Sequence, residues 1–375
     1  MKLMHLSDLH LGKRVNEFPM LEDQQYILTK IINIVDEEKP DGVMIAGDIF
    51  DKSIPGEEAV QLWDDFLNRL VQRNIKVFII SGNHDSAVRV SEYNRLIRTA
   101  GVYISPAYSG EVTPVSLEDE HGSLNIYMLP YIKPPIVRSF LPEEKIDDYT
   151  DACRVAIGQM QVNPKERNVL ITHQFVTGAT RCESEEIVVG GLDNVDVSVF
   201  DAFDYVALGH IHGRQSIGRE TVRYCGTPLK YSFSEKDHIK SVTIVELGAK
   251  NDITVRECPL TPRHDLREIR GTYEELTCRE NYENTVVDDY IHAVLTDEED
   301  VVDAVLKLRI IYPNLMKLSY DNKRTRGNQT IDYSEDVEAK SPLTLFETFY
   351  ETQNNQPMSE EQKDFVQGLI QSIWG

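Results

Sequence analysis

The residues most able to do chemistry in this chain are carboxylates, an amide and imidazoles that follow directly after apolar runs. The first such cluster is Asp8 and His10, in the stretch LMHLSDLHLG. A carboxylate and an imidazole two residues apart can bind a metal ion, but Asp-x-His also arises by chance, with an exposed aspartate and a structural histidine. The pair is therefore informative only if the pattern is repeated.

The pattern returns four times along the chain. Short apolar runs of this kind are typical of buried strands, and sites in open α/β sheets lie at the carboxyl ends of strands. The repeats GVMIAGDIFD, KVFIISGNHD, NVLITHQF and YVALGHIHG supply Asp48, Asn83, His173, His210 and His212. We interpret all of these residues, together with the first pair, as metal ligands.

Seven ligands of mixed oxygen and nitrogen type exceed what one metal ion requires. They fit two ions about 3.5–4 Å apart, which clamp a phosphate group and activate water for in-line attack. Asp48 has two oxygens to share and is the candidate bridging ligand, while Asn83 adds an oxygen without adding negative charge. The absence of thiolates from the set favours manganese, with iron, zinc or magnesium as alternatives.

Two residues beside the ligands have a different predicted role. His84 follows Asn83 too closely to be an easy second ligand, and histidine changes charge near neutral pH, so we expect it to protonate the departing oxygen. Asp51 is a candidate for holding the tautomer of His84, and capping of a turn is an equally good interpretation. No Ser-His-Asp or Cys-His arrangement is evident, so we expect the nucleophile to be water.

Alternating helices and strands must position these clusters. Apolar residues at helical spacing predict helices at about 21–38, 57–73 and 90–99, each preceded by a strand. This order predicts right-handed crossovers and a largely parallel sheet. From 101 to 247 short strands prevail, with one helix at about 147–161. The fold class predicted is α/β, a four-layer α/β/β/α sandwich.

The remaining third of the chain carries no chemical motif. We expect a catalytic domain of residues 1–250, a small α+β domain of 251–321 with a helix beginning near 297, a linker of 322–340, and a helical tail of 341–375. Ser359 and Gln362 form a capping-box pattern at the start of the second tail helix. The tail has much apolar surface, which either packs back on its own domain or docks on a partner.

Composition limits the cellular setting. No apolar stretch approaches the roughly 18 residues of a membrane span, and the chain starts directly with a strand-like segment, without a signal-peptide pattern. Five scattered cysteines without a Cys-x-x-Cys pair suit a reducing compartment, so we expect a cytoplasmic protein. The net charge of −23 argues against tight DNA binding by this chain alone.

The motifs D8-x-H10, G47-D48-x-x-D51, G82-N83-H84-D85, T172-H173 and G209-H210-x-H212 resemble those of the calcineurin-like metallophosphoesterase superfamily. The longer strings SDLHLGK, AGDIFD, SGNHDS, THQF and LGHIHGRQ, followed by YCGTPLKYSF, are similar to the SbcD family of bacterial nucleases. The resemblance covers residues 1–235, and the small domain and tail lie where that family has its capping domain and partner-binding segment.

The resemblance implies two metal sites that share one aspartate. One ion would be held by Asp8, His10, Asp48 and His212, and the other by Asp48, Asn83, His173 and His210. It further implies a manganese-dependent double-strand exonuclease and single-strand or hairpin endonuclease, acting in DNA end processing and repair. The nuclease would form a homodimer through its N-terminal domain within a heterotetramer, with residues 341–375 binding an SbcC-type coiled-coil ABC ATPase.

Two other functions are considered. A related phosphodiesterase or phosphatase could act on small or protein substrates with the same metals, but it would need neither the second domain nor the apolar tail. A non-catalytic scaffold could use the tail for assembly, but it would have no use for a complete ligand set or for His84.

Overall fold

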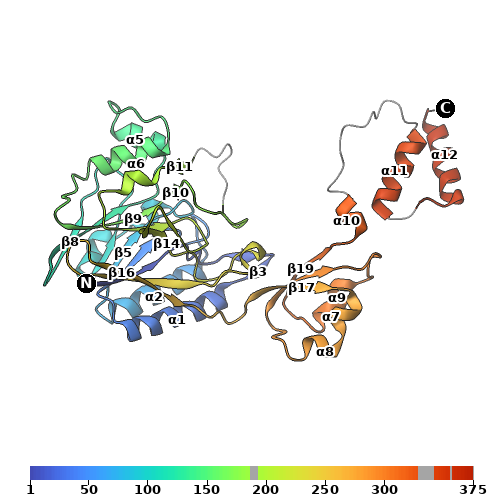
Figure 1. Cartoon of the computed structure of the whole chain (residues 1–375), viewed down its shortest axis with the longest axis horizontal. Helices are drawn as coiled ribbons and strands as arrows, with labels where there is room; N and C mark the ends of the chain where they lie inside the picture. The colour runs from blue at the N-terminus through green and yellow to red at the C-terminus, as the bar shows by residue number, and fades with distance from the viewer. Residues whose placement is uncertain (186–192, 328–341, 355–356, 375) are drawn as a thin grey trace. The chain divides into compact units, whose positions relative to one another are not determined.

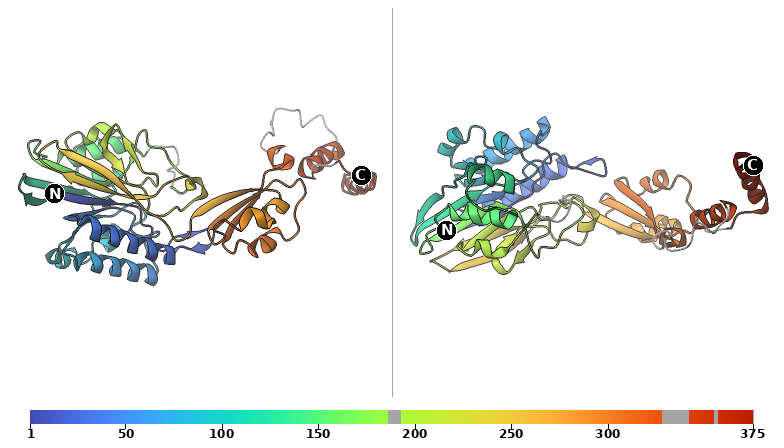
Figure 2. Two further views of the ribbon diagram at one scale, coloured as in Figure 1. Left: turned by 60° about the horizontal axis from the view of Figure 1, so that its bottom comes forward. Right: turned by 90° about the horizontal axis from the view of Figure 1, so that it is seen from above.

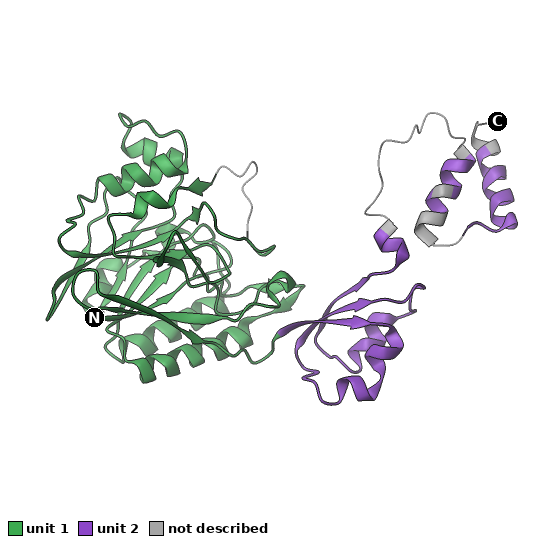
Figure 3. Ribbon diagram, viewed as in Figure 1, with its two compact units in different colours: residues 1–265 green, residues 266–375 purple. Residues whose placement is uncertain are grey.

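The computed structural model describes residues 1–185, 193–327, 342–354 and 357–374, and it divides the chain into two compact units (Figures 1 and 3). These units are Met1–Asp265 and Leu266–Gly375. Within the described residues, no helix is both long enough and apolar enough to cross a bilayer.

A six-stranded sheet with the order β16-β15-β1-β4-β5-β6 carries the first three ligand clusters. Its strands are β1 (Lys2–Leu6), β4 (Gly42–Ala46), β5 (Lys76–Ile80), β6 (Val102–Ile104), β15 (Ser241–Leu247) and β16 (Ile253–Pro259). The strands β1, β4, β5 and β6 are parallel, because each is joined to the next by a helical crossover. On the other side of β1, β15 pairs with β1 in the antiparallel sense, and β16 pairs with β15 and forms the edge of the sheet.

The crossover helices of this sheet are α1 (Leu21–Glu38), α2 (Glu57–Val71), α3 (Ala87–Val90) and α4 (Asn94–Ile97), followed by the 3-10 turn η1 (Arg98–Ala100). The first of these has the predicted bounds. The single helix expected at 90–99 is wrong, because Tyr93 has a left-handed φ of 61° that separates α3 from α4. A short hairpin, β2 (Arg14–Val15) and β3 (Phe18–Pro19), precedes α1.

The second six-stranded sheet, with the order β13-β14-β12-β9-β8-β7, carries the last two ligand clusters. Its strands are β7 (Val115–Asp119), β8 (Gly122–Leu129), β9 (Arg167–His173), β12 (Tyr205–Gly209), β13 (Gln215–Ile217) and β14 (Arg219–Tyr224). Outside it lie α5 (Pro134–Phe140) and α6 (Tyr149–Gly158), and the short elements β10 (Phe175–Val176), β11 (Asn194–Val195), η2 (Val197–Phe200) and η3 (Phe233–Glu235) complete the unit.

The two sheets pack face to face, with helices on both outer sides (Figure 2). Side chains from both sheets form one core, which includes Met44 and Phe78 from the first sheet and Val169 and Ala207 from the second. A separate core joins the second sheet to α5 and α6. The predicted α/β/β/α sandwich is confirmed. The first unit extends past the boundary expected at residue 250, because β16 pairs with β15 along its whole length.

The second unit contains a parallel three-stranded sheet with the order β17-β18-β19. Its elements are β17 (Leu266–Gly271), α7 (Tyr273–Thr277), α8 (Arg279–Tyr282), β18 (Tyr290–Leu295), α9 (Ala304–Arg309), β19 (Leu315–Tyr320) and α10 (Lys323–Gly327). The helix expected from about 297 begins only at Ala304, because Asp303 has a left-handed φ of 54° and Asp297 instead accepts the backbone N–H of Tyr273.

The tail consists of α11 (Pro342–Asn354) and α12 (Glu360–Trp374). The predicted capping box is present, with the Ser359 N–H donating to Oε1 of Gln362 and the Gln362 N–H donating to the Ser359 hydroxyl. Gln362 also donates to the hydroxyl of Tyr350, which joins the two helices. Most of the expected linker, residues 328–340, lies outside the described residues.

Candidate metal centre

The seven predicted ligands converge at the carboxyl ends of five strands. Three clusters of donor atoms, each within 4.8 Å, account for most of them: Asp8, His10 and His212; His10, Asp48 and His84; and Asp8, Asp48 and His173. Asn83 adjoins the third cluster, because its Oδ1 lies at hydrogen-bond distance from His173. The same oxygen lies at hydrogen-bond distance from His210. Residues separated by up to about 200 positions therefore meet in one pocket, and all except Asn83 are buried.

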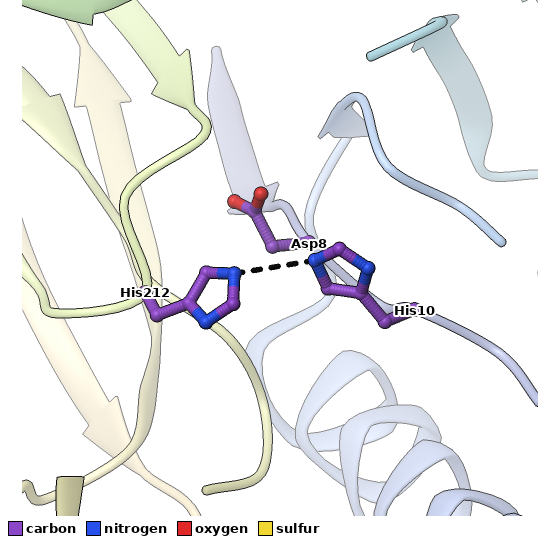
Figure 4. Close-up of side chains that lie close together, drawn as sticks. All are labelled: Asp8, His10 and His212. Carbon is purple, nitrogen blue, oxygen red and sulfur yellow. Dashed lines mark hydrogen bonds between the residues drawn. The ribbon is translucent and has the colours of Figure 1, made fainter. Parts of the chain in front are cut away.

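The first cluster joins the two sheets. His10 follows β1 and His212 follows β12, and their Nε2 atoms lie 3.2 Å apart, with the Asp8 carboxylate beside them (Figure 4). When two imidazole nitrogens bind the same ion, each at about 2.1 Å, the nitrogens lie roughly 3 Å apart. The distance between His10 and His212 therefore suits one shared metal ion. Both oxygens of Asp8 also accept the backbone N–H of His210, at 3.1 Å, which fixes the Asp8 carboxylate relative to the loop that carries His210 and His212.

A further cluster of predicted ligands, Asn83, His173 and His210, is arranged around Asn83. Its Oδ1 lies 2.9 Å from Nε2 of His173 and 2.9 Å from Nδ1 of His210. Asp48 lies between the two clusters, because its Oδ2 is 3.3 Å from Nε2 of His173 and 3.8 Å from Nε2 of His10. This placement is the one that a bridging carboxylate requires.

The ligand loops adopt an unusual backbone. Asp8, His10, Asp48 and His210 all have positive φ, at 53°, 45°, 49° and 104°. Such conformations cost non-glycine residues about 1–3 kcal/mol each and cluster at functional sites. They are held by hydrogen bonds between the loops after β1 and β4, in which Asp8 N–H donates to the Gly47 carbonyl and His10 N–H donates to the Asp48 carbonyl.

Glycines next to the ligands allow the loops to approach this closely. A Cβ on Gly82 would lie 2.1 Å from Oδ1 of Asp48, and a Cβ on Gly209 would lie 1.8 Å from the carbonyl oxygen of Ala46. The Gly-Asn and Gly-His dipeptides of the motifs thus have a steric cause. Any larger residue at either glycine would push the ligand strands apart.

The protonation pattern fits a metal centre. Nδ1 of His173 lies 2.8 Å from the Ala46 carbonyl, which can only accept, so Nδ1 carries a proton and Nε2, which faces Asp48, is the nitrogen that can bind an ion once it has lost its own proton. Burial lowers the pKa of His10 well below its usual value and that of His210 to about 3, so both imidazoles are neutral. Within the described residues, Nδ1 of His10 has no hydrogen-bond partner.

The carboxylates give the pocket a negative charge that a cation would balance. Burial opposes ionisation of Asp48, but the charge and hydrogen bond of His173 outweigh it and hold the pKa of that carboxyl well below its usual range. Burial likewise lowers the pKa of His173, but the Asp48 carboxylate outweighs this and raises the value to about 9. Without a metal, a proton on His173 therefore stands in for part of the missing positive charge.

The two residues with predicted proton-transfer roles lie at the edge of the pocket. One ring nitrogen of His84 is within 4.8 Å of donor atoms of His10 and Asp48, and the His84 N–H donates to Oδ1 of Asp48. The backbone carbonyl of Asp51, not its carboxylate, contacts Nδ1 of His84, at 2.9 Å. The carboxylate pairs with Lys13 at 2.8 Å and lies 3.8 Å from Nδ1 of His10.

Further residues support the site without being predicted from the ligand pattern. The Asp85 carboxylate accepts the backbone N–H groups of Ile49, Phe50 and Gly82, which ties the second and third ligand loops together. Burial raises the pKa of Asp85 to about 6. The only sequence feature that could have indicated this role of Asp85 is its position beside Asn83 and His84. Two of its backbone partners lie over thirty residues away, so the contacts themselves could not be predicted.

Gln24, from α1, supports the first ligand loop. Its side-chain amide donates to the carbonyl of His10 at 2.7 Å and to the hydroxyl of Tyr231 at 3.0 Å, while its carbonyl accepts the N–H of Gly12. Tyr231 in turn donates to the carbonyl of Leu9. A glutamine in a helix carries no sequence signal for this role.

The sandwich and the convergence of the seven predicted ligands are those of a metallophosphoesterase. Residues 1–214 match the family described as calcineurin-like phosphoesterase, and residues 262–354 match one described as type 5 capsule protein repressor C-terminal domain. Two relatives named as the D subunit of the nuclease SbcCD, from Staphylococcus epidermidis and Staphylococcus saprophyticus subsp. saprophyticus, are each 31% identical across 100% of this chain and 99% and 98% of their own. The chain belongs to the calcineurin-like phosphoesterases and, within them, to the SbcD family.

Two solved structures that resemble this chain are more distant from it in sequence. TT1561 of Thermus thermophilus and a dimetal phosphatase from Danio rerio are each 11% identical over 68% of this chain, with TM-scores of 0.40 and 0.41. The alignments cover 98% and 95% of those two chains.

The steric role of Gly209 leads to a first prediction. Gly209→Ala should lower metal affinity by at least about tenfold, because the added Cβ displaces the Ala46 carbonyl that orients His173. Isothermal titration with Mn²⁺ measures this directly. Gly158→Ala is the matched control, since a Cβ at Gly158 meets open space and should leave the titration unchanged. Equal affinity in the two variants would contradict the packing argument.

The proton held by His173 leads to a second prediction. Below pH 9 the metal-free protein carries a proton on His173 that must leave before Nε2 can bind an ion. Metal binding at pH 7 should therefore release about one proton, and affinity should rise by up to about tenfold per pH unit as the pH approaches 9. Titrations in buffers of different ionisation enthalpy measure the number of protons released. An affinity independent of pH between 7 and 8.5 would contradict this.

Proposed function

We propose that this chain is a metal-dependent DNA nuclease that hydrolyses phosphodiesters with two divalent ions, for which Mn²⁺ is the best candidate. The observation that carries the proposal is the placement of Asp48 between two ligand clusters, each of which draws residues from both sheets. Relatives across the full length of the chain are named as nuclease subunits, which supports DNA as the substrate.

The ligands assigned to the two ions are Asp8, His10, Asp48 and His212 for one, and Asp48, Asn83, His173 and His210 for the other. When bound, the ions supply positive charge to a phosphate group and a more acidic water as nucleophile. The chain's own groups do the rest. Asn83 adds an uncharged ligand, and half-buried His84 at the edge of the pocket places an imidazole where it can protonate the departing oxygen.

The activity we infer combines double-strand exonuclease and single-strand or hairpin endonuclease action in DNA end processing and repair, in the cytoplasm. The net charge of −23 means that the chain by itself offers little attraction for a DNA backbone. The ions at the site and a partner protein would have to supply the positive charge. In this respect the chain differs from a nuclease that binds DNA in a basic groove of its own.

A phosphatase or phosphodiesterase for small or protein substrates is the alternative from the same family. The metal centre is compatible with either function, because it recognises only the phosphate group. The second unit and the tail, which a small-substrate enzyme does not need, favour the nuclease. A non-catalytic scaffold is disfavoured by the strained ligand loops, because a chain without metal chemistry gains nothing from maintaining them.

Cleavage of circular single-stranded DNA tests the enzymatic function. The isolated chain with Mn²⁺ should cut this substrate, which has no ends and so reports endonuclease action. Asp48→Ala should lose both metal and cleavage, whereas His84→Ala should keep the metal and lose about 10²–10⁴-fold in turnover, as expected for a proton donor. His121→Ala, which changes an exposed histidine in the turn between β7 and β8, is the control.

The outcomes of that experiment separate the alternatives. Hydrolysis of a small phosphodiester without any DNA cleavage would favour the alternative function, a phosphatase or phosphodiesterase for small or protein substrates. Protein that retains no stoichiometric metal would favour the scaffold. Loss of metal in His84→Ala would make His84 a ligand.

The tail is proposed to bind an SbcC-type coiled-coil ABC ATPase. The described residues of α11 and α12 expose Phe346, Phe349, Phe365 and Leu369, although the two helices contact each other. Apolar surface of this kind on a short helical hairpin is characteristic of a helix-in-groove or coiled-coil interface. The match of residues 262–354 to a C-terminal family domain includes α11 and therefore supports a shared role for this region.

Deletion of residues 341–375 should preserve intrinsic cleavage and prevent co-purification of the ATPase. Phe365→Asp is a more conservative test, because this side chain is 68% exposed and its replacement should not disturb the hairpin. Lys317→Asp on β19, which is also exposed, serves as the control. Co-purification that survives both changes to the tail would contradict its docking role.

A homodimer through the first unit is part of the same proposal. Right-handed crossovers place α1, α2 and the α3–α4 segment on one face of the first sheet. At the end of this row, Val88, Tyr93 and Leu96 are exposed. Burial of three such side chains by a second copy would contribute roughly 1.5–3 kcal/mol per fully buried residue.

Leu96→Glu should convert the dimer to a monomer, because it places a charge in the apolar contact. Light scattering coupled to size-exclusion chromatography measures the change in mass. Leu306→Glu on α9 is a matched control, since Leu306 is 66% exposed and Leu96 is 71% exposed. A mass that is unchanged in Leu96→Glu, with a dimeric parent, would place the interface elsewhere.

A further inference from the structure

Behind His212 lies a chain of hydrogen bonds that the ligand pattern does not explain. Nδ1 of His212 is 2.8 Å from the hydroxyl of Ser184, and that hydroxyl donates to Oε1 of Glu235 at 2.6 Å. The other carboxylate oxygen of Glu235 accepts from the ammonium group of Lys240. Ser184 and Glu235 lie 51 positions apart and belong to none of the strand-end motifs.

The positions of the hydrogens in this chain follow from the chemistry of its members. Glu235 is fully buried and paired with Lys240, so its carboxylate is ionised and can only accept. The single hydroxyl hydrogen of Ser184 must therefore go to Glu235. The Ser184 oxygen can then only accept from His212, which places a proton on Nδ1 and leaves the Nε2 lone pair facing His10.

The same turn contacts His212 a second time. The Glu185 carboxylate accepts the backbone N–H of His212 at 2.7 Å and also the N–H of Cys182 at 2.9 Å. Lys240 adds a third contact from the other side, because its ammonium group donates to the carbonyl of His212 at 2.9 Å. The side chain and both backbone polar groups of this ligand are thus held, two of them by the turn Cys182–Glu185.

We propose that Ser184 and Glu235 are positioning residues that form a hydroxyl relay, fixing the tautomer and orientation of His212 and coupling its metal site to the turn Cys182–Glu185. The proposal rests on His212 being a metal ligand, as argued under the proposed function. Metal ligands that are histidines commonly donate their second ring N–H to a carboxylate or carbonyl. Here a serine extends that contact to a carboxylate too distant to bond directly, at 3.6 Å.

Coupling between a ligand and a turn acts in both directions. If the turn orients His212 for the metal, metal binding must in turn stabilise the turn. The backbone N–H of Cys182, which donates to the Glu185 carboxylate, should therefore exchange with solvent more slowly when the site is loaded. This readout does not depend on enzymatic activity.

The experiment compares full-length wild-type protein with Ser184→Ala, Ser184→Thr and Ser319→Ala. Ser184→Ala removes the relay and should weaken one of the two Mn²⁺ binding steps by about 10- to 100-fold. Ser184→Thr keeps the hydroxyl and should restore affinity to near the wild-type value. Ser319→Ala is the matched control, because the Ser319 hydroxyl also lies 2.8 Å from a histidine nitrogen, that of His292 in the second unit.

Hydrogen exchange of the Cys182–Glu185 turn, with and without Mn²⁺, completes the test. Mn²⁺ should slow exchange in wild type and Ser184→Thr, and have a smaller effect in Ser184→Ala. Wild-type affinity and protection in Ser184→Ala would overturn the relay. A wild-type protein that binds no Mn²⁺ would instead overturn the metal centre on which the relay depends, so the two failures are distinguishable.

Discussion

The burial of two carboxylates, Asp8 and Asp48, in one pocket is the constraint on which the rest of the structure depends. Two buried like charges are unfavourable unless cations or hydrogen-bond donors compensate them. The chain surrounds them with imidazoles and backbone N–H groups: His210 N–H on Asp8, and His84 N–H on Asp48. The remaining negative charge is what a divalent cation in this pocket would balance.

The two sheets make this arrangement rigid. Each ligand loop follows a strand whose side chains are buried on both faces, so the strand ends cannot move independently. The contacts across the sheets, such as that of His173 with the Ala46 carbonyl, then determine how the loops meet. Four of the predicted ligands have a strained backbone with positive φ. Hydrogen bonds between the loops, such as those from the Asp8 and His10 N–H groups, compensate the cost of this strain.

The negative charge and the apolar surfaces point to a protein that works in an assembly. With 62 acidic and 39 basic residues, the chain does not have the charge expected of a protein that holds DNA unaided. The exposed apolar side chains of the α3–α4 segment and of the tail lie in separate units, so they are suited to different partners. Under the proposed function, catalysis and substrate capture would be divided between subunits.

The sequence by itself determined the candidate ligands, the strands that carry them and the sandwich, because these features depend on local patterns of residues. Apolar runs predict β1, β4, β5, β9 and β12, and the helical spacing of residues 21–38 predicts α1 with its observed bounds. The tail helices and the Ser359 capping box are likewise local. Each of these predictions needs only residues close together in the chain.

Only the tertiary structure decided what surrounds the ligands. The contacts of Ser184 with His212 and Glu235, and of Gln24 with Tyr231, join residues from 28 to 207 positions apart. The role of Asp51 also depended on the fold, because its carbonyl and its carboxylate face different histidines. Polar side chains of this kind acquire their partners when the sheets pack, and no periodicity along the chain records which partner that will be.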